Sequence, residues 1–186
     1  MSSIGVQHVV QNIHMIQHRT GTLGHAIQRV LRNMDINAGL ALDQLIQTPQ
    51  QGTAAGQGDA VVSDQGYLLG MVVEAEPTSC KVMTILHPNF NAAGVVSRTR
   101  DNGIVTGSSE YAADGLCVLT NLARNTLTEK SDQVITTGLG GVFPADLLVG
   151  VVQELVPEVS GKSTIAVIKP GTDPRTVRHA FIITSF

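Results

Sequence analysis

The chain has 186 residues, of which 42% are hydrophobic and 15% are charged, and its formal net charge is -3. This length can bury a real core in one domain or two small ones, and the low net charge disfavours global disorder. The acidic balance and an aromatic content of 3% disfavour nucleic-acid binding, which relies on a basic face and on stacking side chains. We therefore expect a globular chain with no nucleic-acid partner.

Membrane and export signals are not visible in the sequence. The longest apolar run, residues 67–73, contains Gly70 and is far shorter than the roughly 18 to 20 residues of a membrane helix. The first residues lack the basic segment and apolar block of a signal peptide. Any membrane association is thus expected through segments that this sequence does not contain.

The first fifty residues have a helical pattern. Val9, Ile13 and Ile16 follow i, i+4, i+7 spacing, which is typical of a helix with one apolar face. Gly21 and Gly24 interrupt the pattern and divide it into two helices. We expect a helical arm over residues 1–50, followed by a Gly- and Gln-rich linker that cannot build a core face.

From residue 59 onward the pattern is that of β-structure. Short runs rich in Val, Ile and Thr alternate with clusters of Gly, Pro, Asn and Asp, as in small barrels or sandwiches. Asp64-Gln-Gly66 and Asp101-Asn-Gly103 have turn chemistry. The expected fold is mainly β, with a first β-domain over residues 51–90, open to completion by later strands, and a second over 91–186. Strands are predicted at 60–62, 67–73, 82–86, 95–99, 104–106, 116–119, 134–137, 147–153, 164–168 and 180–184.

Candidate ligands and nucleophiles have weak support. His14 and His18 stand at i, i+4 on the predicted helix and could share a metal, yet no third ligand is evident beside His8 or His25. We interpret all four as solvent-facing. Cys80 and Cys117 lie in or beside apolar strands, so buried free thiols are favoured over a disulfide.

Catalytic arrangements are equally weak. Ser and His side chains occur without the G-x-S-x-G elbow, and paired acids on one strand face are more often solvated than catalytic. The charged turn near residue 175 is expected to face solvent, with a partner contact as a lesser option. We predict no catalytic, cofactor or metal site. The residues considered are Ser63, Asp64 and His87; Ser185 and His179; Glu74 and Glu76; and Asp173, Arg175 and Arg178.

The most unusual string is a glycine-rich segment between two predicted strands. It lacks both the lysine-serine/threonine ending of a P-loop and the third glycine of the dinucleotide fingerprint. We interpret it as a structural turn in which Phe143 fills an apolar gap and Pro144 fixes the path of the chain. The signature residues are Gly138, Leu139, Gly140, Gly141, Val142, Phe143, Pro144 and, in the following strand, Gly150.

The sequence from about residue 56 to the C-terminus resembles the extracytoplasmic β-region of the bacterial rod shape-determining MreC family. The resemblance runs through Gly56-Gln-Gly-Asp-Ala-Val-Val62, Asp64-Gln-Gly-Tyr-Leu-Leu-Gly-Met-Val72 and Asn102-Gly-Ile-Val-Thr-Gly107. Its most specific part is Gly138-Leu-Gly-Gly-Val-Phe-Pro144 with Val149-Gly150 after it.

This resemblance implies a non-enzymatic scaffold of the cell-elongation machinery with paired small β-barrels. It implies a class B penicillin-binding transpeptidase, MreD and the MreB system as partners, self-association, and a periplasmic location. We expect apolar strand surfaces at Tyr67, Leu68, Leu69, Val149 and Val151 to contribute to these contacts. A small-ligand or carbohydrate-binding barrel with residues 138–143 as its rim is the alternative, and an enzyme is the third.

Overall fold

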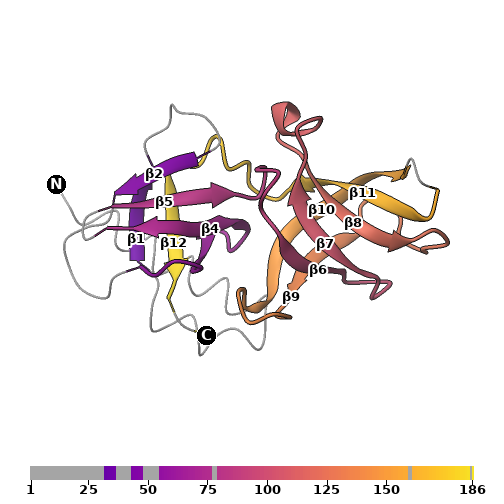
Figure 1. Ribbon diagram of the computed structural model, residues 1–186, viewed down its shortest axis with the longest axis horizontal. Helices are drawn as coiled ribbons and strands as arrows, with labels where there is room; N and C mark the ends of the chain where they lie inside the picture. Colours follow the sequence, from indigo (N-terminus) through magenta and orange to yellow (C-terminus); the bar gives the residue numbers. More distant parts are fainter. Residues whose placement is uncertain (1–31, 37–42, 48–54, 77–78, 159–160, 185) are drawn as a thin grey trace.

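The protein folds into two antiparallel β-barrels lying side by side (Figure 1). The computed structural model describes residues 32–36, 43–47, 55–76, 79–158, 161–184 and 186. The first barrel runs in the order β1-β12-β3-β4-β5-β2 and the second in the order β10-β11-β8-β7-β6-β9. The prediction of a mainly β fold with two small barrels is confirmed.

The two barrels divide the strands unevenly along the chain. The first contains β1 (Arg32–Ile36), β2 (Asp43–Gln47), β3 (Ala60–Ser63), β4 (Leu68–Ala75), β5 (Ser79–Thr84) and β12 (His179–Ile183). The second contains β6 (Ala92–Val96), β7 (Asn102–Gly107), β8 (Cys117–Ala123), β9 (Gln133–Thr137), β10 (Ala145–Pro157) and β11 (Ser163–Pro170), with a short 3-10 helix η1 (Ala112–Asp114) before β8.

All ten predicted strands are present, with shifted ends. Gly66 has the positive φ of 82° expected of its turn. The turn predicted at residues 101–103 lies earlier instead, with Arg100 at φ 64°, while Asn102 and Gly103 already belong to β7. In the β6–β7 ladder Val95 pairs with Asn102 and Gly94 pairs with Gly103. Cross-strand pairing therefore places both residues of the predicted turn in strand β7.

The expected helical arm is wrong at two places, because β1 and β2 are strands. β1 pairs with β12 through four residue pairs, and β2 pairs with β5 through five. Those partners supply the backbone hydrogen bonds that a helix would have made internally, and such tertiary pairing overrides a weak local preference. The remainder of the expected arm, including His8, His14, His18 and His25, lies outside the described residues.

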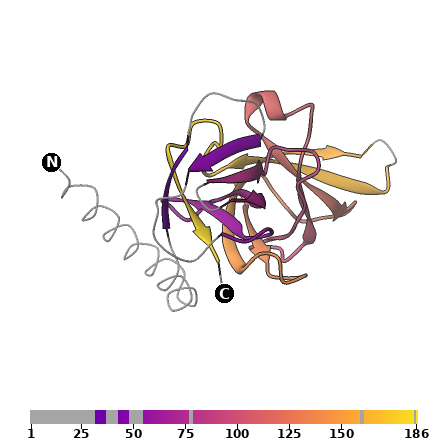
Figure 2. The same ribbon diagram turned by 60° about the vertical axis from the view of Figure 1, so that its left-hand side comes forward.

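The last strand returns to the first barrel. β12 lies between β1 and β3, and both views show this yellow C-terminal strand among the indigo and purple strands from the start of the chain (Figures 1 and 2). Phe181 pairs with Val62 across the β12–β3 ladder. The first β-unit is therefore completed by a later strand, and the segment 91–186 contributes to both barrels.

Strands β3, β4 and β12 are buried on both faces. Alternate residues belong to two different core clusters: Val61, Leu69 and Ile182 belong to a cluster confined to the first barrel. Their strand neighbours Val62 and Leu68 belong to a larger cluster that extends into the second barrel. Because both faces are covered, these strands have nearly continuous apolar sequences instead of a polar-apolar alternation.

The junction between the barrels is also held by polar contacts. Tyr67 forms a parallel bridge with Leu148, and the Gly171 backbone N–H donates to the Val149 carbonyl at 3.0 Å. On the segment from β11 to β12, the Arg175 Nη1 donates to the carbonyl of Ala113 in η1. Arg175 thus links two segments of the molecule, while Arg175 and Arg178 remain exposed as expected of a solvent-facing turn.

A compact hydrogen-bond network joins the two loops at one end of the second barrel. The Thr126 hydroxyl donates to the Asp101 carboxylate at 2.5 Å, and the Thr128 hydroxyl donates to the same oxygen at 3.2 Å. The hydrogen bond from Thr126 lowers the pKa of Asp101, opposed by burial and reinforced by Thr99 and Thr128. The ionised carboxylate thus stabilises the pairing of the β6–β7 and β8–β9 connections.

We predict that Asp101→Asn destabilises the protein at neutral pH by about 1–2 kcal/mol, because it replaces charge-assisted hydrogen bonds with neutral ones. A folded-state pKa below the ordinary value means that this stabilisation is complete above the unfolded pKa near 3.9 and is lost as pH falls through the lower folded pKa. Urea unfolding of both proteins between pH 7 and pH 2.5 should show the difference shrinking only below about pH 4. A difference that stayed constant down to pH 2.5 would contradict this role for the carboxylate.

Candidate interaction surface

The glycine-rich segment forms the connection between β9 and β10. Gly138, Gly140 and Gly141 have φ values of 76°, 86° and 66°, a backbone region that side chains with a Cβ rarely adopt. At its base the Thr136 hydroxyl donates to the Pro144 carbonyl at 2.6 Å and accepts from the Leu147 N–H at 3.0 Å. Both hydrogen bonds are buried, so the loop has a fixed base.

Phe143 anchors this loop in the core. Its side chain is buried at 4% exposure, and its ring lies 5.6 Å from that of Phe90 at an interplanar angle of 56°. A tilted pair at this distance is a favourable aromatic arrangement. Phe143 therefore fills an apolar gap, and it does not line an open rim for a small ligand.

The same loop exposes two apolar side chains to solvent. Leu139 is 69% exposed and Val142 is 42% exposed, on either side of the glycine pair. The other exposed large apolar residues of the second barrel stand singly on separate segments, namely Ile104, Leu127 and Val151. The β9–β10 loop thus has two exposed apolar side chains and a base that is fixed by buried hydrogen bonds. We call residues 138–144 the anchor loop.

The predicted apolar strand surface is mostly internal. Leu68, Leu69 and Val149 are 0%, 3% and 0% exposed, so they do not form an exterior surface. Tyr67 is half-buried at the junction with Leu148, whereas Val151 is 40% exposed. Leu68 and Val149 belong to the core cluster that extends through both barrels, whereas Leu69 belongs to the core of the first barrel alone. The sequence could not reveal this because it does not show which strands face each other.

Gly150 is required by close packing between strands. A Cβ built at this position would lie 2.1 Å from the Lys169 carbonyl oxygen on the neighbouring strand β11. That distance is far inside van der Waals contact, so the β10–β11 ladder can pass here only with glycine.

Three of the side chains considered for catalysis, those of Ser63, His87 and Glu76, have structural roles, and Ser185 lies outside the described residues. The buried Ser63 hydroxyl accepts from the Tyr67 N–H at 3.1 Å and lies 3.2 Å from the Thr172 hydroxyl. His87 Nδ1 accepts from the Asn89 N–H at 3.1 Å. Glu74 is exposed, and Glu76 accepts from the Ser79 hydroxyl at 3.1 Å. These groups stabilise turns and hairpins.

Both cysteines are free and buried, as predicted. Burial, with a smaller contribution from Asp59, raises the pKa of Cys80 to about 11. Burial raises the pKa of Cys117 to about 12. Thiols with such values stay protonated at neutral pH and are poor nucleophiles.

The described residues contain neither a cluster of metal ligands nor a membrane-spanning helix. No group of three or more His, Cys, Asp or Glu side chains in those ranges could hold a metal ion. No helix within them is long and apolar enough to cross a bilayer.

The fold and this surface define a tandem β-barrel protein whose second barrel is inserted before the last strand of the first. The sequence matches the family described as rod shape-determining protein MreC, barrel core, over residues 49–184. The chain belongs to this MreC family.

Individual relatives agree with this assignment. The cell shape-determining protein MreC of Listeria monocytogenes is 29% identical over 129 residues, which cover 67% of this chain and 43% of that protein. The chain thus spans less than half the length of this relative.

Solved structures show the same fold. A structure of MreC from Listeria monocytogenes superposes with a TM-score of 0.70 at 20% identity, covering 96% of this chain and 90% of that one. The major periplasmic domain of the cell shape-determining filament MreC gives 0.67 at 19% identity, with 84% and 96% covered. A complex between the penicillin-binding protein PBP2 and MreC from Helicobacter pylori gives 0.60 at 15% identity, with 82% and 97% covered.

We predict that Phe143→Ala destabilises the protein by about 3–4 kcal/mol, because it leaves a cavity beside Phe90 and frees the base of the anchor loop. Chemical denaturation would measure the loss, with Leu139→Ala as the exposed control expected to change stability by less than about 0.5 kcal/mol. Equal stabilities of the two variants would show that the ring of Phe143 is not a core element.

A second prediction compares two glycines. Gly150→Ala should cost about 2–3 kcal/mol, because the added Cβ meets the Lys169 carbonyl and forces the strands apart. Gly140→Ala should lower the free energy of unfolding by about 1 kcal/mol. The added Cβ would meet no atom within 4 Å, so only the positive φ is unfavourable. Thermal unfolding of both variants under one condition tests the order, and a larger loss for Gly140→Ala would contradict it.

Proposed function

We propose that this chain is a scaffold of the bacterial cell-elongation machinery that binds a class B penicillin-binding transpeptidase on the extracytoplasmic side of the membrane. The observation that carries the proposal is the family match, which covers the whole second barrel and four of the six strands of the first. Two structural relatives support it, namely the MreC that is in complex with PBP2 and the periplasmic domain of MreC. The chain acts by surface complementarity and not by bond chemistry.

The wider set of partners follows from the family resemblance. MreD, the MreB system and further copies of the same chain are proposed as additional contacts, through this part or through other parts of a longer protein. Self-association and membrane attachment require no catalytic group. The hydrogen bonds of Ser63 and His87, which stabilise turns, are consistent with such a non-catalytic role.

The anchor loop is the surface best suited to docking the transpeptidase. Docking onto a preformed structure avoids the entropic cost of ordering a flexible segment, and the buried hydrogen bonds of Thr136 fix this loop before any partner arrives. Leu139 and Val142 supply adjacent apolar area that is still exposed. Burying such side chains at the centre of a contact would provide its favourable free energy.

We predict that Leu139→Asp combined with Val142→Asp weakens binding to the purified extracytoplasmic domain of the transpeptidase by at least about tenfold, which corresponds to about 1.4 kcal/mol. Leu127→Asp is the matched control, since Leu127 is 75% exposed on another loop, and it should bind as the unaltered protein does. Biolayer interferometry at physiological salt would measure both.

The outcomes separate the proposed surface from the proposed partner. Binding that survives the double substitution would overturn the anchor loop as the docking surface. An unaltered chain that does not bind the transpeptidase at micromolar concentration would overturn the scaffold proposal itself.

A further inference from the structure

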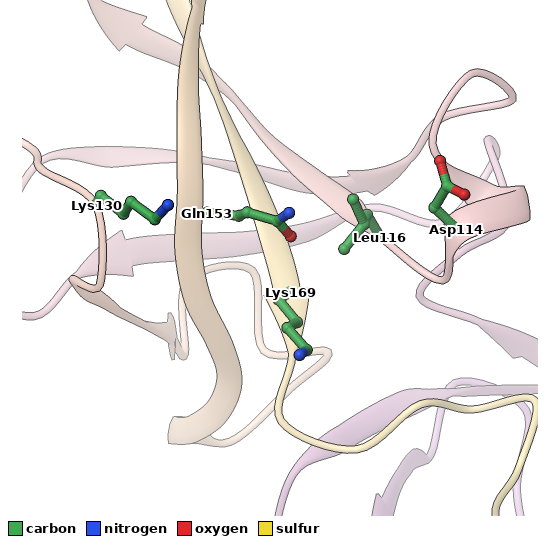
Figure 3. Close-up of a pocket in the computed structure, with 5 residues that line it drawn as sticks. All are labelled: Asp114, Leu116, Lys130, Gln153 and Lys169. Atoms are coloured by element: carbon green, nitrogen blue, oxygen red, sulfur yellow. The ribbon is translucent and has the colours of Figure 1, made fainter.

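A pocket lined mostly by charged and polar residues lies on the second barrel and shares no residue with the anchor loop (Figure 3). Its volume is about 530 Å³, in the range that accommodates small ligands. Four segments meet there: the stretch from η1 to the residue before β8, the β8–β9 loop, β10 and β11. The lining residues are Asp114, Leu116, Lys130, Gln153 and Lys169.

Two of these residues project from the outer wall of the barrel. Lys169 pairs across the strands with Val151, whose 40% exposure shows that this face of the wall is open to solvent. Gln153 lies at a register shift between Val152 and Glu154. A bulge of this kind redirects a side chain from the regular alternation, and Figure 3 shows Gln153 pointing toward Leu116.

Lys130 is brought to the same pocket by its loop. The N–H of Ser131 donates to the Val152 carbonyl at 2.7 Å, and the Val152 N–H donates to the Asp132 carbonyl at 2.8 Å. Ser131 has a φ of 75°. These bonds hold the loop against β10 immediately beside Gln153.

The acids closest in sequence to Lys130 face Arg98. Glu129 lies 3.6 Å from Arg98 and Asp132 lies 2.7 Å from it. Among the described residues neither Lys130 nor Lys169 has an ion-pair partner. A concave site with two such cations attracts carboxylates.

We propose that this pocket binds a short acidic peptide segment. Its carboxylates pair with Lys130 and Lys169, the Gln153 amide hydrogen-bonds to the peptide backbone, and an apolar side chain packs on Leu116. Asp114 at the η1 end disfavours a second carboxylate there and so sets the direction of the peptide.

Two other ligand classes fit the pocket less well. Saccharides usually stack on aromatic rings, and the lining contains none. Anionic lipid surfaces are bound by clusters of about four to eight basic residues, whereas this concave site has two. The inference uses different residues from the anchor loop and does not depend on transpeptidase binding.

Titration of the 15N-labelled full chain with the dipeptide acetyl-Leu-Asp tests the proposal, because this probe has two carboxylates and one apolar side chain. We expect saturable shifts of the backbone amide signals of Lys130, Gln153 and Lys169. Lys130→Gln combined with Lys169→Gln should weaken binding about tenfold or more, whereas Lys162→Gln, which removes the same charge elsewhere, should change it less than about twofold. The melting temperatures should agree within about 2 °C, since all three lysines are exposed.

Three further probes make the result specific. Acetyl-Leu-Asn-amide, which lacks both charges, should produce no shifts at these positions, and inorganic phosphate should bind more weakly than acetyl-Leu-Asp. The proposal is overturned if the double variant binds the dipeptide as well as the unaltered chain does, or if phosphate binds equally well. It is also overturned if the chain sediments with phosphatidylglycerol vesicles through these lysines while the dipeptide causes no shifts.

Discussion

Burial of strands β3, β4 and β12 on both faces is the constraint on which the rest of the structure depends. Val61 and Ile182 complete the core confined to the first barrel, while Val62 and Phe181 beside them pack into the cluster shared with the second. A polar residue at either kind of position would lose water without gaining a partner. One face of these strands thus lies in the core of the first barrel and the other face packs against the second barrel. Rotation of one barrel relative to the other would therefore expose apolar surface.

This constraint determines where a partner can bind. The most apolar strand segments are buried inside the molecule and are not available to a partner. Leu68 and Val149, for example, are fully buried in the cluster shared by the two barrels. Surfaces open to other molecules must then come from loops and from the outer wall of the second barrel. The anchor loop and the lysine-lined pocket are such places. The Thr136 hydroxyl fixes the base of the first, and backbone hydrogen bonds between the β8–β9 loop and β10 hold the second.

The strands from β3 onward could be predicted because each is marked by a pattern within its own short stretch of sequence. Runs of Val, Ile and Thr between turn residues mark each strand from β3 onward, and the glycines and Phe143 mark the anchor loop. Long-range pairing is different, since nothing in residues 32–36 indicates that β12 will lie beside them. Leu139 and Val142 belong to the glycine-rich turn that the sequence already marks. The Lys130–Lys169 pocket instead depends on four segments that only the folded barrel brings together.

Register shifts connect packing with surface chemistry. In β4 the shift between Val72 and Glu74, and in β10 the shift between Val152 and Glu154, each follow a fully buried valine and precede an exposed glutamate. Without such a bulge, strict alternation would carry an apolar face along the whole strand. In β10 the bulge interrupts the alternation, so that Gln153 and Glu154 are both exposed, while Leu155 beyond them packs against the core again. The same distortion therefore places Gln153 in the lysine-lined pocket.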